Sequence, residues 1–209
     1  MTKIALPQRG LYAITGSFLS PNSLIEDVEQ VIQGGAVMIQ YRDKKNATAT
    51  QLEIARQLLV VCNQHAIPLI INDNIELAKL VGAQGVHIGK DDGDLAEAKA
   101  CLPPNSIIGA TCYNDLNNAI KAEKQGASYV AFGRFHPSKS KPDAPTADLG
   151  ILVQAKKSVS IPITAIGGIS AENGSKLIER GADLLAVIDT VFGAESPQLA
   201  AQKMALLFK

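Results

Sequence analysis

Residues 33–40 have the sequence QGGAVMIQ, and a similar pattern recurs as VGAQGVHI at 81–88, QGASYVAF at 125–132 and RGADLLAV at 180–187. Each copy places glycine after a helical pattern and before a short apolar run. Glycine at such a joint suits the left-handed end of a helix, and a buried run rich in Val, Ile and Leu suits a parallel strand. The repeat therefore predicts that helices and strands alternate along the chain.

Eight strands and eight helices are expected on this pattern. The predicted strands are Gly10–Thr15, Val37–Tyr41, Pro68–Asn72, Gly85–Ile88, Ile107–Ala110, Tyr129–Phe132, Pro162–Ile166 and Leu184–Ile188. The predicted helices are Leu24–Gly34, Thr48–His65, Ile75–Leu80, Leu95–Cys101, Leu116–Gln125, Ile151–Ser158, Ala171–Arg180 and Pro197–Phe208. Eight such units favour an α/β fold that closes as a (β/α)8 TIM barrel, with a doubly wound open sheet as the alternative.

Three helix starts carry capping signals. Ser23-x-x-Glu26 and Thr48-x-x-Gln51 match the capping box, in which a hydroxyl and an acidic or amide side chain satisfy free backbone N–H groups. Ser196-Pro197 places a hydroxyl at the cap and proline at the first helical position.

The length of 209 residues suits one barrel domain over residues 1–209. Apolar residues make up 46% and aromatic residues 4%, so an aliphatic core is expected. The 20 basic and 20 acidic residues balance, which argues against a nucleic-acid or membrane-surface partner. Small molecules are the expected partners, and the sequence leaves a homo-oligomer open.

The cysteines Cys62, Cys101 and Cys112 are odd in number and lack metal-ligand spacing, so reduced thiols in a cytoplasmic protein are expected. No run approaches 18 apolar residues, and Met1–Ile4 does not resemble the start of a signal peptide.

Cationic and amide side chains follow the second predicted strand. Gln40, Arg42 and Lys44 would share one face, because side chains alternate along an extended segment. Chemistry in these barrels lies at the carboxyl ends of the strands, where such a face suits an anion. A solvated strand end is the alternative interpretation.

Carboxylates follow the next two strands at the same edge. Asp73 and Asp92 would suit Mg²⁺, which takes one or two carboxylates and completes its shell with water and phosphate oxygens. Helix capping is the alternative for both. Thr111 ends the fifth strand, where its hydroxyl could cap a helix or donate to phosphate. His87 has no partner at ligand spacing and is expected to be a hydrogen-bonded barrel residue, and Cys112 has no neighbouring base.

A second anion site is expected after strands six to eight. The long loop after Phe132 contains Ser138, Lys139, Ser140 and Lys141 between prolines, which suits anion capture unless the loop is simply solvated. Gly167-Gly168 and Ile188-Asp189-Thr190 follow the last two strands, where these barrels commonly bind phosphate. One site thus suits a metal-bound diphosphate, and the other suits a single phosphate.

These motifs together resemble the thiamine-phosphate synthase family, from Leu11-Tyr12 to Ile188. The resemblance rests on Gln40-x-Arg42-x-Lys44, Asn72-Asp73, His87-Ile88-Gly89 with Asp92, Gly133 through Pro137, Ser138-Lys139-Ser140-Lys141, and Gly167-Gly168-Ile169. The last motif alone is unspecific, because other phosphate-binding barrels share it.

The resemblance implies a transferase that joins 4-amino-2-methyl-5-(diphosphooxymethyl)pyrimidine to a thiazole phosphate, carboxylated in bacteria, and releases pyrophosphate. It implies one Mg²⁺ on Asp73 and Asp92, with Arg42, Lys44 and Lys141 stabilising the departing diphosphate. The implied pyrimidine diphosphate site consists of Gln40, Tyr41, Arg42, Asp43, Lys44, Asn72, Thr111 and Lys141. The implied thiazole phosphate site consists of Ser138, Lys139, Ser140, Gly168, Ile188 and Asp189.

Two positions depart from the family pattern. Thr111 often corresponds to serine, which keeps the hydroxyl, whereas Asp189 stands where a small residue is common and would repel phosphate if it faced it. A thiazole tautomerase-like isomerase remains an alternative, although it would not need the diphosphate apparatus. A non-catalytic sensor of a phosphate ligand is supported by Asp189 alone, and a phosphosugar barrel would leave the lysine–serine loop unexplained.

Overall fold

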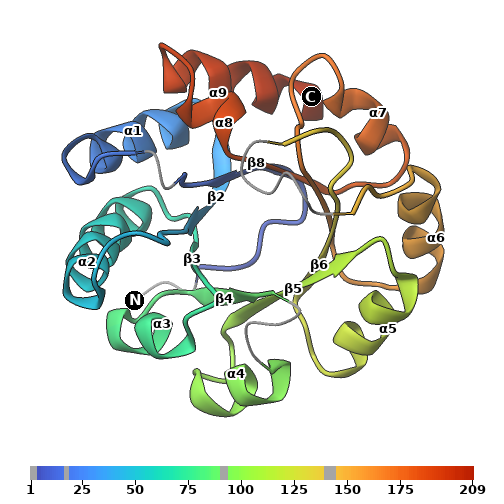
Figure 1. The fold of residues 1–209 in the computed structure, drawn as a ribbon, viewed down its shortest axis with the longest axis horizontal. Coiled ribbons are helices and arrows are strands. Elements are labelled where there is room, and N and C mark those ends of the chain that lie inside the picture. Colours follow the sequence, from blue (N-terminus) through green and yellow to red (C-terminus); the bar gives the residue numbers. More distant parts are fainter. Residues whose placement is uncertain (1–3, 17–18, 90–93, 139–144) are drawn as a thin grey trace.

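A computed structural model describes residues 4–16, 19–89, 94–138 and 145–209. Eight parallel strands close into a barrel in their order along the chain, and helices form a ring around them (Figure 1). The (β/α)8 barrel is therefore confirmed. Four predicted site residues, Asp92, Lys139, Ser140 and Lys141, lie outside the described residues.

The strands are β1 (Gly10–Ile14), β2 (Ala36–Tyr41), β3 (Leu69–Asn72), β4 (Gly85–Ile88), β5 (Ile107–Tyr113), β6 (Tyr129–Phe132), β7 (Ile163–Ile166) and β8 (Leu184–Val187). The α-helices are α1 (Pro21–Gln33), α2 (Thr48–Gln64), α3 (Ile75–Val81), α4 (Leu95–Cys101), α5 (Leu116–Lys124), α6 (Gly150–Ser158), α7 (Gly174–Glu179), α8 (Asp189–Phe192) and α9 (Pro197–Ala205). A 3₁₀-helix, η1 (Leu206–Phe208), follows α9.

Most element boundaries lie within one residue of the sequence prediction, but α1 starts at Pro21 instead of Leu24 and α9 ends at Ala205 instead of Phe208. Three further differences involve β5, α7 and α8. Strand β5 continues to Tyr113, beyond the predicted end at Ala110. Helix α7 starts at Gly174 instead of Ala171, because Asn173 accepts from the Ser170 backbone N–H and donates to the Gly168 carbonyl, which folds the preceding residues into a turn. The short helix α8 was not predicted, since its four residues directly follow β8 without a separating loop pattern.

Two of the three predicted caps are wrong. Ser20, not Ser23, caps α1, and its hydroxyl accepts from the Ser23 backbone N–H, because the proline at position 21 already begins the helix. Thr48 lies inside the first turn of α2, whose N-cap is Ala47 without a side-chain hydrogen bond. The predicted Ser196 cap of α9 is confirmed by its contact with the Leu199 backbone N–H.

Apolar side chains form two layers, one inside the barrel and one between the strands and the helices. The alternation of strand residues separates them, because successive side chains point to opposite faces. The inner layer contains Tyr12, Met38, Ile70, Tyr129 and Leu184. Its upper part becomes polar, with Gln40, His87 and Thr164 buried toward the carboxyl ends of the strands. The fold thus reserves one end of the barrel interior for polar contacts.

Candidate active site at the carboxyl ends of the strands

A pocket of about 280 Å³ opens at the carboxyl ends of the strands. All eight strands and several of the loops after them contribute to its lining. The predicted site residues that line it are Gln40, Arg42, Asn72, Asp73, Thr111, Ser138, Gly168, Ile188 and Asp189. Residues from both predicted anion sites therefore share one cavity.

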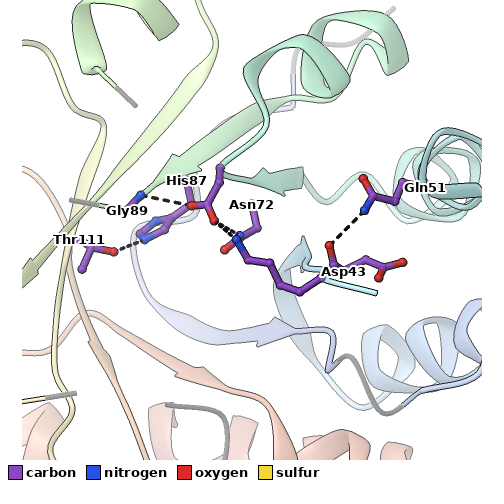
Figure 2. Close-up of polar contacts among 8 residues, drawn as sticks. Asp43, Gln51, Asn72, His87, Gly89 and Thr111 are labelled. Atoms are coloured by element: carbon purple, nitrogen blue, oxygen red, sulfur yellow. Dashed lines mark hydrogen bonds and ion pairs between the residues drawn. The ribbon is translucent and has the colours of Figure 1, made fainter. Parts of the chain in front are cut away.

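Asp73 turns its carboxylate away from helix α3 and into the pocket. Its backbone is left-handed, with φ of 61°, and Asn74 instead caps α3 by accepting from the Leu77 backbone N–H at 2.9 Å. The Lys44 ammonium lies 2.7 Å from Asp73 Oδ2, and the Asn72 amide donates to the same oxygen at 2.5 Å (Figure 2). The Gly89 backbone N–H donates to Oδ1 at 3.3 Å. Asn74 thus fills the capping role, and the Asp73 carboxylate is left to the site.

Asp43 organises the loop between β2 and α2. Its Oδ1 accepts from the backbone N–H groups of Lys45 and Asn46, at 2.9 and 3.1 Å. Its Oδ2 accepts from the Tyr41 hydroxyl and the Asn46 amide, at 2.9 and 2.6 Å. Partial burial alone would raise the pKa of Asp43, but these donors outweigh it and lower the pKa below its ordinary value.

The same loop is anchored from both ends. The Gln51 amide donates to the Asp43 carbonyl (Figure 2) and to the Asn46 carbonyl. The Arg42 backbone N–H donates to the Thr15 hydroxyl at 2.8 Å. Tyr41 is buried among the side chains between barrel and helices. The side chains of Tyr41 and Asp43 therefore serve the loop that carries Arg42 and Lys44, and neither residue is part of the pocket lining.

A row of hydrogen-bonded side chains crosses the barrel beneath the pocket. The Gln40 amide donates to the Tyr12 hydroxyl at 2.5 Å, and the Tyr12 and Tyr129 hydroxyls lie 2.8 Å apart. Tyr129 contacts His87 Nδ1 at 2.9 Å, and His87 Nε2 contacts the Thr111 hydroxyl at 2.9 Å (Figure 2). We call these five residues the buried relay. The expected hydrogen-bonded role of His87 is confirmed.

Glycines shape the opposite side of the pocket. Gly167 and Gly168 have φ of 102° and 61°, in the region that favours glycine. A Cβ on Gly167 would overlap Arg134, and one on Gly168 would overlap the Pro137 carbonyl and His136. The backbone N–H groups of Phe135 and His136 donate to the carbonyls of Ile166 and Gly167, at 3.2 and 3.0 Å. The glycines thus let the loop after β6 pack directly on the loop after β7.

Comparison with known proteins agrees with this geometry. The sequence model described as "Thiamine monophosphate synthase" matches residues 11–191. The chain belongs to the thiamine monophosphate synthase family. It is 42% identical over 199 residues to a thiamine-phosphate synthase of Thiobacillus denitrificans, covering 95% of this chain and 94% of the relative. It is 47% identical over 197 residues to a thiamine-phosphate synthase of Marinobacter nauticus, covering 94% and 88%.

A solved structure of this family has the same barrel. The thiamine phosphate pyrophosphorylase from Pyrococcus furiosus superposes with a TM-score of 0.88 at 35% identity, covering 96% of each chain. The family resemblance expected from the sequence motifs is therefore confirmed, and the chain is an enzyme of a transferase family.

The sequence interpretation assigned no role to several polar pocket residues of this family member, among them Tyr12, Arg134 and Thr164. Tyr12 and Arg134 lie within quoted motifs, but no role was assigned to them. Thr164 alternates with the apolar residues of β7, and this period-two position was the available signal. Its hydroxyl is fully buried without a hydrogen-bond partner among the described residues.

The three cysteines of this family member are free thiols, and two of them are buried. Cys62 and Cys112 are buried free thiols, and burial raises the pKa of each to about 12. Cys101 is exposed on helix α4. In the part of the chain that the structure describes, no three His, Cys, Asp or Glu side chains gather as a metal cluster, and no helix is long and apolar enough to cross a membrane.

Proposed function

We propose that this chain joins the pyrimidine diphosphate to the thiazole phosphate, giving thiamine phosphate and pyrophosphate. One observation carries the proposal: the Asp73 carboxylate faces the pocket beside Lys44 and Asn72, and Arg42 lines the same pocket. A cation cluster with an available carboxylate suits a diphosphate and its metal ion. The family names of the relatives support the same reaction.

The donor set fits Mg²⁺. Asp73 offers hard carboxylate oxygens in the pocket, its Oδ2 already attracts the Lys44 ammonium, and Mg²⁺ requires only one or two protein carboxylates. Asp73 would hold the ion together with Asp92, which the sequence places after the neighbouring strand. When bound, Mg²⁺ supplies positive charge that neutralises the diphosphate.

The chain's own residues would act mainly by electrostatics and positioning. The C–O bond to the diphosphate breaks and its electron pair leaves with pyrophosphate, stabilised by Arg42, Lys44 and Lys141. The aminopyrimidine carries the resulting methylene cation, and the thiazole nitrogen lone pair forms the new C–N bond. The second substrate is held through its phosphate by the loops after β6 to β8, including Ser138 and Gly168, which orients that nitrogen. No protein nucleophile is needed, in keeping with the buried thiols of Cys62 and Cys112.

We also propose that the protein is cytoplasmic. Its free thiols support this location, because the cytoplasm keeps cysteines reduced.

One assay tests the reaction. The protein is incubated with both substrates and Mg²⁺, and thiamine phosphate and pyrophosphate are quantified together. We expect equal amounts of the two products, and loss of both when a chelator is added. If neither product appears, the synthase proposal fails, and unchanged turnover in chelator would remove the metal from the mechanism. Isomerisation of the thiazole phosphate alone would instead support the tautomerase alternative.

A further inference from the structure

The buried relay links five different strands, β1 to β2 and β4 to β6. Tyr12, Tyr129 and Gln40 are at most 2% exposed, so bulk water does not satisfy their hydrogen-bonding groups. Four of its five members, Gln40, Tyr12, His87 and Thr111, line the pocket, and Tyr129 lies behind them. A row of hydrogen bonds in a dry interior has a direction, because each hydroxyl has only one proton to donate.

Proton counting fixes that direction. The Tyr12 hydroxyl accepts from the Gln40 amide, so its own proton is available for Tyr129, its one other hydrogen-bond partner among the described residues. Tyr129, which accepts from Tyr12, then donates to His87 Nδ1. A neutral imidazole protonated at Nε2 donates in turn to Thr111. Reversing the Tyr12–Tyr129 bond would leave the Tyr12 proton buried and unpaired, which is costly.

The absence of a side chain at Gly109 leaves room for the contact between Tyr129 and His87. Gly109 lies on β5 beside Tyr129 and His87, and a Cβ there would overlap the Tyr129 hydroxyl and His87 Nδ1. The ring of His87 also stacks on Tyr129, with centroids 5.5 Å apart. Burial raises the pKa of Tyr12 and Tyr129 well above the ordinary value, so both hydroxyls keep their protons.

We infer that the buried relay holds His87 as its Nε2–H tautomer and so presents the Thr111 hydroxyl as a hydrogen-bond donor to an anionic oxygen in the pocket. Tyr12 and Tyr129 are then positioning residues, because they act on Thr111 through His87. At the other end, the Gln40 amide keeps its oxygen as an acceptor. The identity of the anion as a diphosphate rests on the proposed function, whereas the direction of the relay does not.

Nitrogen NMR tests the direction without any activity assay. The chain has three histidines, so His87 can be assigned in ¹⁵N-labelled protein by the loss of its signals in His87→Gln. At about pH 8, where imidazole is neutral, we expect a pyridine-type Nδ1 and a pyrrole-type Nε2 for His87. The opposite pattern would overturn the inference. In Tyr129→Phe the donor to Nδ1 is lost, and we expect the two nitrogen shifts to move toward those of mixed tautomers.

Binding of inorganic pyrophosphate with Mg²⁺, measured by calorimetry, tests the donor role. We expect Thr111→Val to weaken binding about tenfold and Thr111→Ser to restore it, since serine keeps the hydroxyl. Tyr129→Phe and Tyr12→Phe should weaken binding less, and raise KM for the diphosphate substrate more than they lower kcat. Equal affinity in Thr111→Val and the parent protein would overturn the donor role. Absence of pyrophosphate binding in the parent protein would count against the proposed function, while the NMR result would still decide the relay.

Discussion

The two sides of the pocket are formed by different parts of the residues, side chains on one side and backbone on the other. Around β2 to β4 the site is made of side chains, with Lys44 and Asn72 on the Asp73 carboxylate and Asp43 holding the adjoining loop. Around β6 and β7 it is made of backbone, where Gly167 and Gly168 let two loops bond directly through N–H and carbonyl groups. The first side depends on the charges of its side chains, whereas the second depends on the close approach of two backbone loops. Substitutions that change charge or volume should therefore affect the two sides differently.

The largest effect is expected from removing charge on the side-chain side. Asp73→Ala should lower kcat by about 10² to 10³-fold, because it deletes the carboxylate that pairs with Lys44 and that we propose as a Mg²⁺ ligand. Steady-state kinetics gives the effect, and thermal unfolding is the control, since the barrel strands do not depend on this residue. Activity equal to that of the parent protein would remove Asp73 from the site.

The next largest effect is expected from adding volume on the backbone side. Gly168→Ala should cost about 2 to 3 kcal/mol of unfolding free energy, because φ is positive and the new Cβ would overlap the Pro137 carbonyl. We expect KM for the thiazole phosphate to rise while KM for the pyrimidine diphosphate changes less.

Gly82→Ala is a matched control for that substitution. Gly82 also has positive φ, of 75°, but it ends α3 and a Cβ there would meet nothing within 4 Å. It should cost only about 1 kcal/mol and leave both KM values unchanged. Equal losses of stability in the two variants would show that backbone conformation, and not the packing of the two loops, limits position 168.

A smaller, pH-dependent effect is expected at Asp43. Its pKa is lowered in the folded protein, so its carboxylate stabilises the fold above the unfolded pKa, and this contribution disappears as pH falls through the folded pKa. Asp43→Asn should lose about 1 kcal/mol at pH 7, with the loss shrinking toward acid pH. Urea unfolding of both proteins at several pH values measures this. A difference in stability that grows on acidification would contradict the assignment.

An effect of similar size but opposite sign is expected at Thr164, a buried residue of β7. Thr164→Val removes a buried hydroxyl that has no partner among the described residues, so it should raise stability by about 1 kcal/mol, or Tm by about 2 to 4 °C. Differential scanning calorimetry is the measurement. A fall in Tm would mean that the hydroxyl is hydrogen-bonded in solution.

The sequence predicted the barrel well because its signals are local and repeated. Apolar runs recur at all eight units and the glycine joint at four of them, and each has a physical meaning over a few residues. The caps failed where a neighbouring residue competed, as Ser20 with proline at position 21 did for α1. Helix α8 was missed because its four residues are too few to show a period.

The site was predictable as a set of residue types and less so as a set of contacts. Asp73 and Asn74 could each have capped α3, and only the left-handed backbone of Asp73 separates the two roles. Tyr12 and Tyr129 are 117 residues apart, so no local sequence pattern predicts their hydrogen bond. Gly167 and Gly168 were read as room for phosphate, whereas in the structure they also make room for the neighbouring loop.

The pairing of β1 with β8 sets the order in which this protein can be completed. Tyr12 pairs with Ala186 in this strand pair. Strand β1, which is translated before the other strands, can therefore pair with β8 only after β8 has been translated. Until then β1 is an open edge on which another chain can pair. A nascent chain therefore contains Arg42, Lys44 and Asp73 long before it has a closed cavity. The pocket can close only after the last strand has been translated.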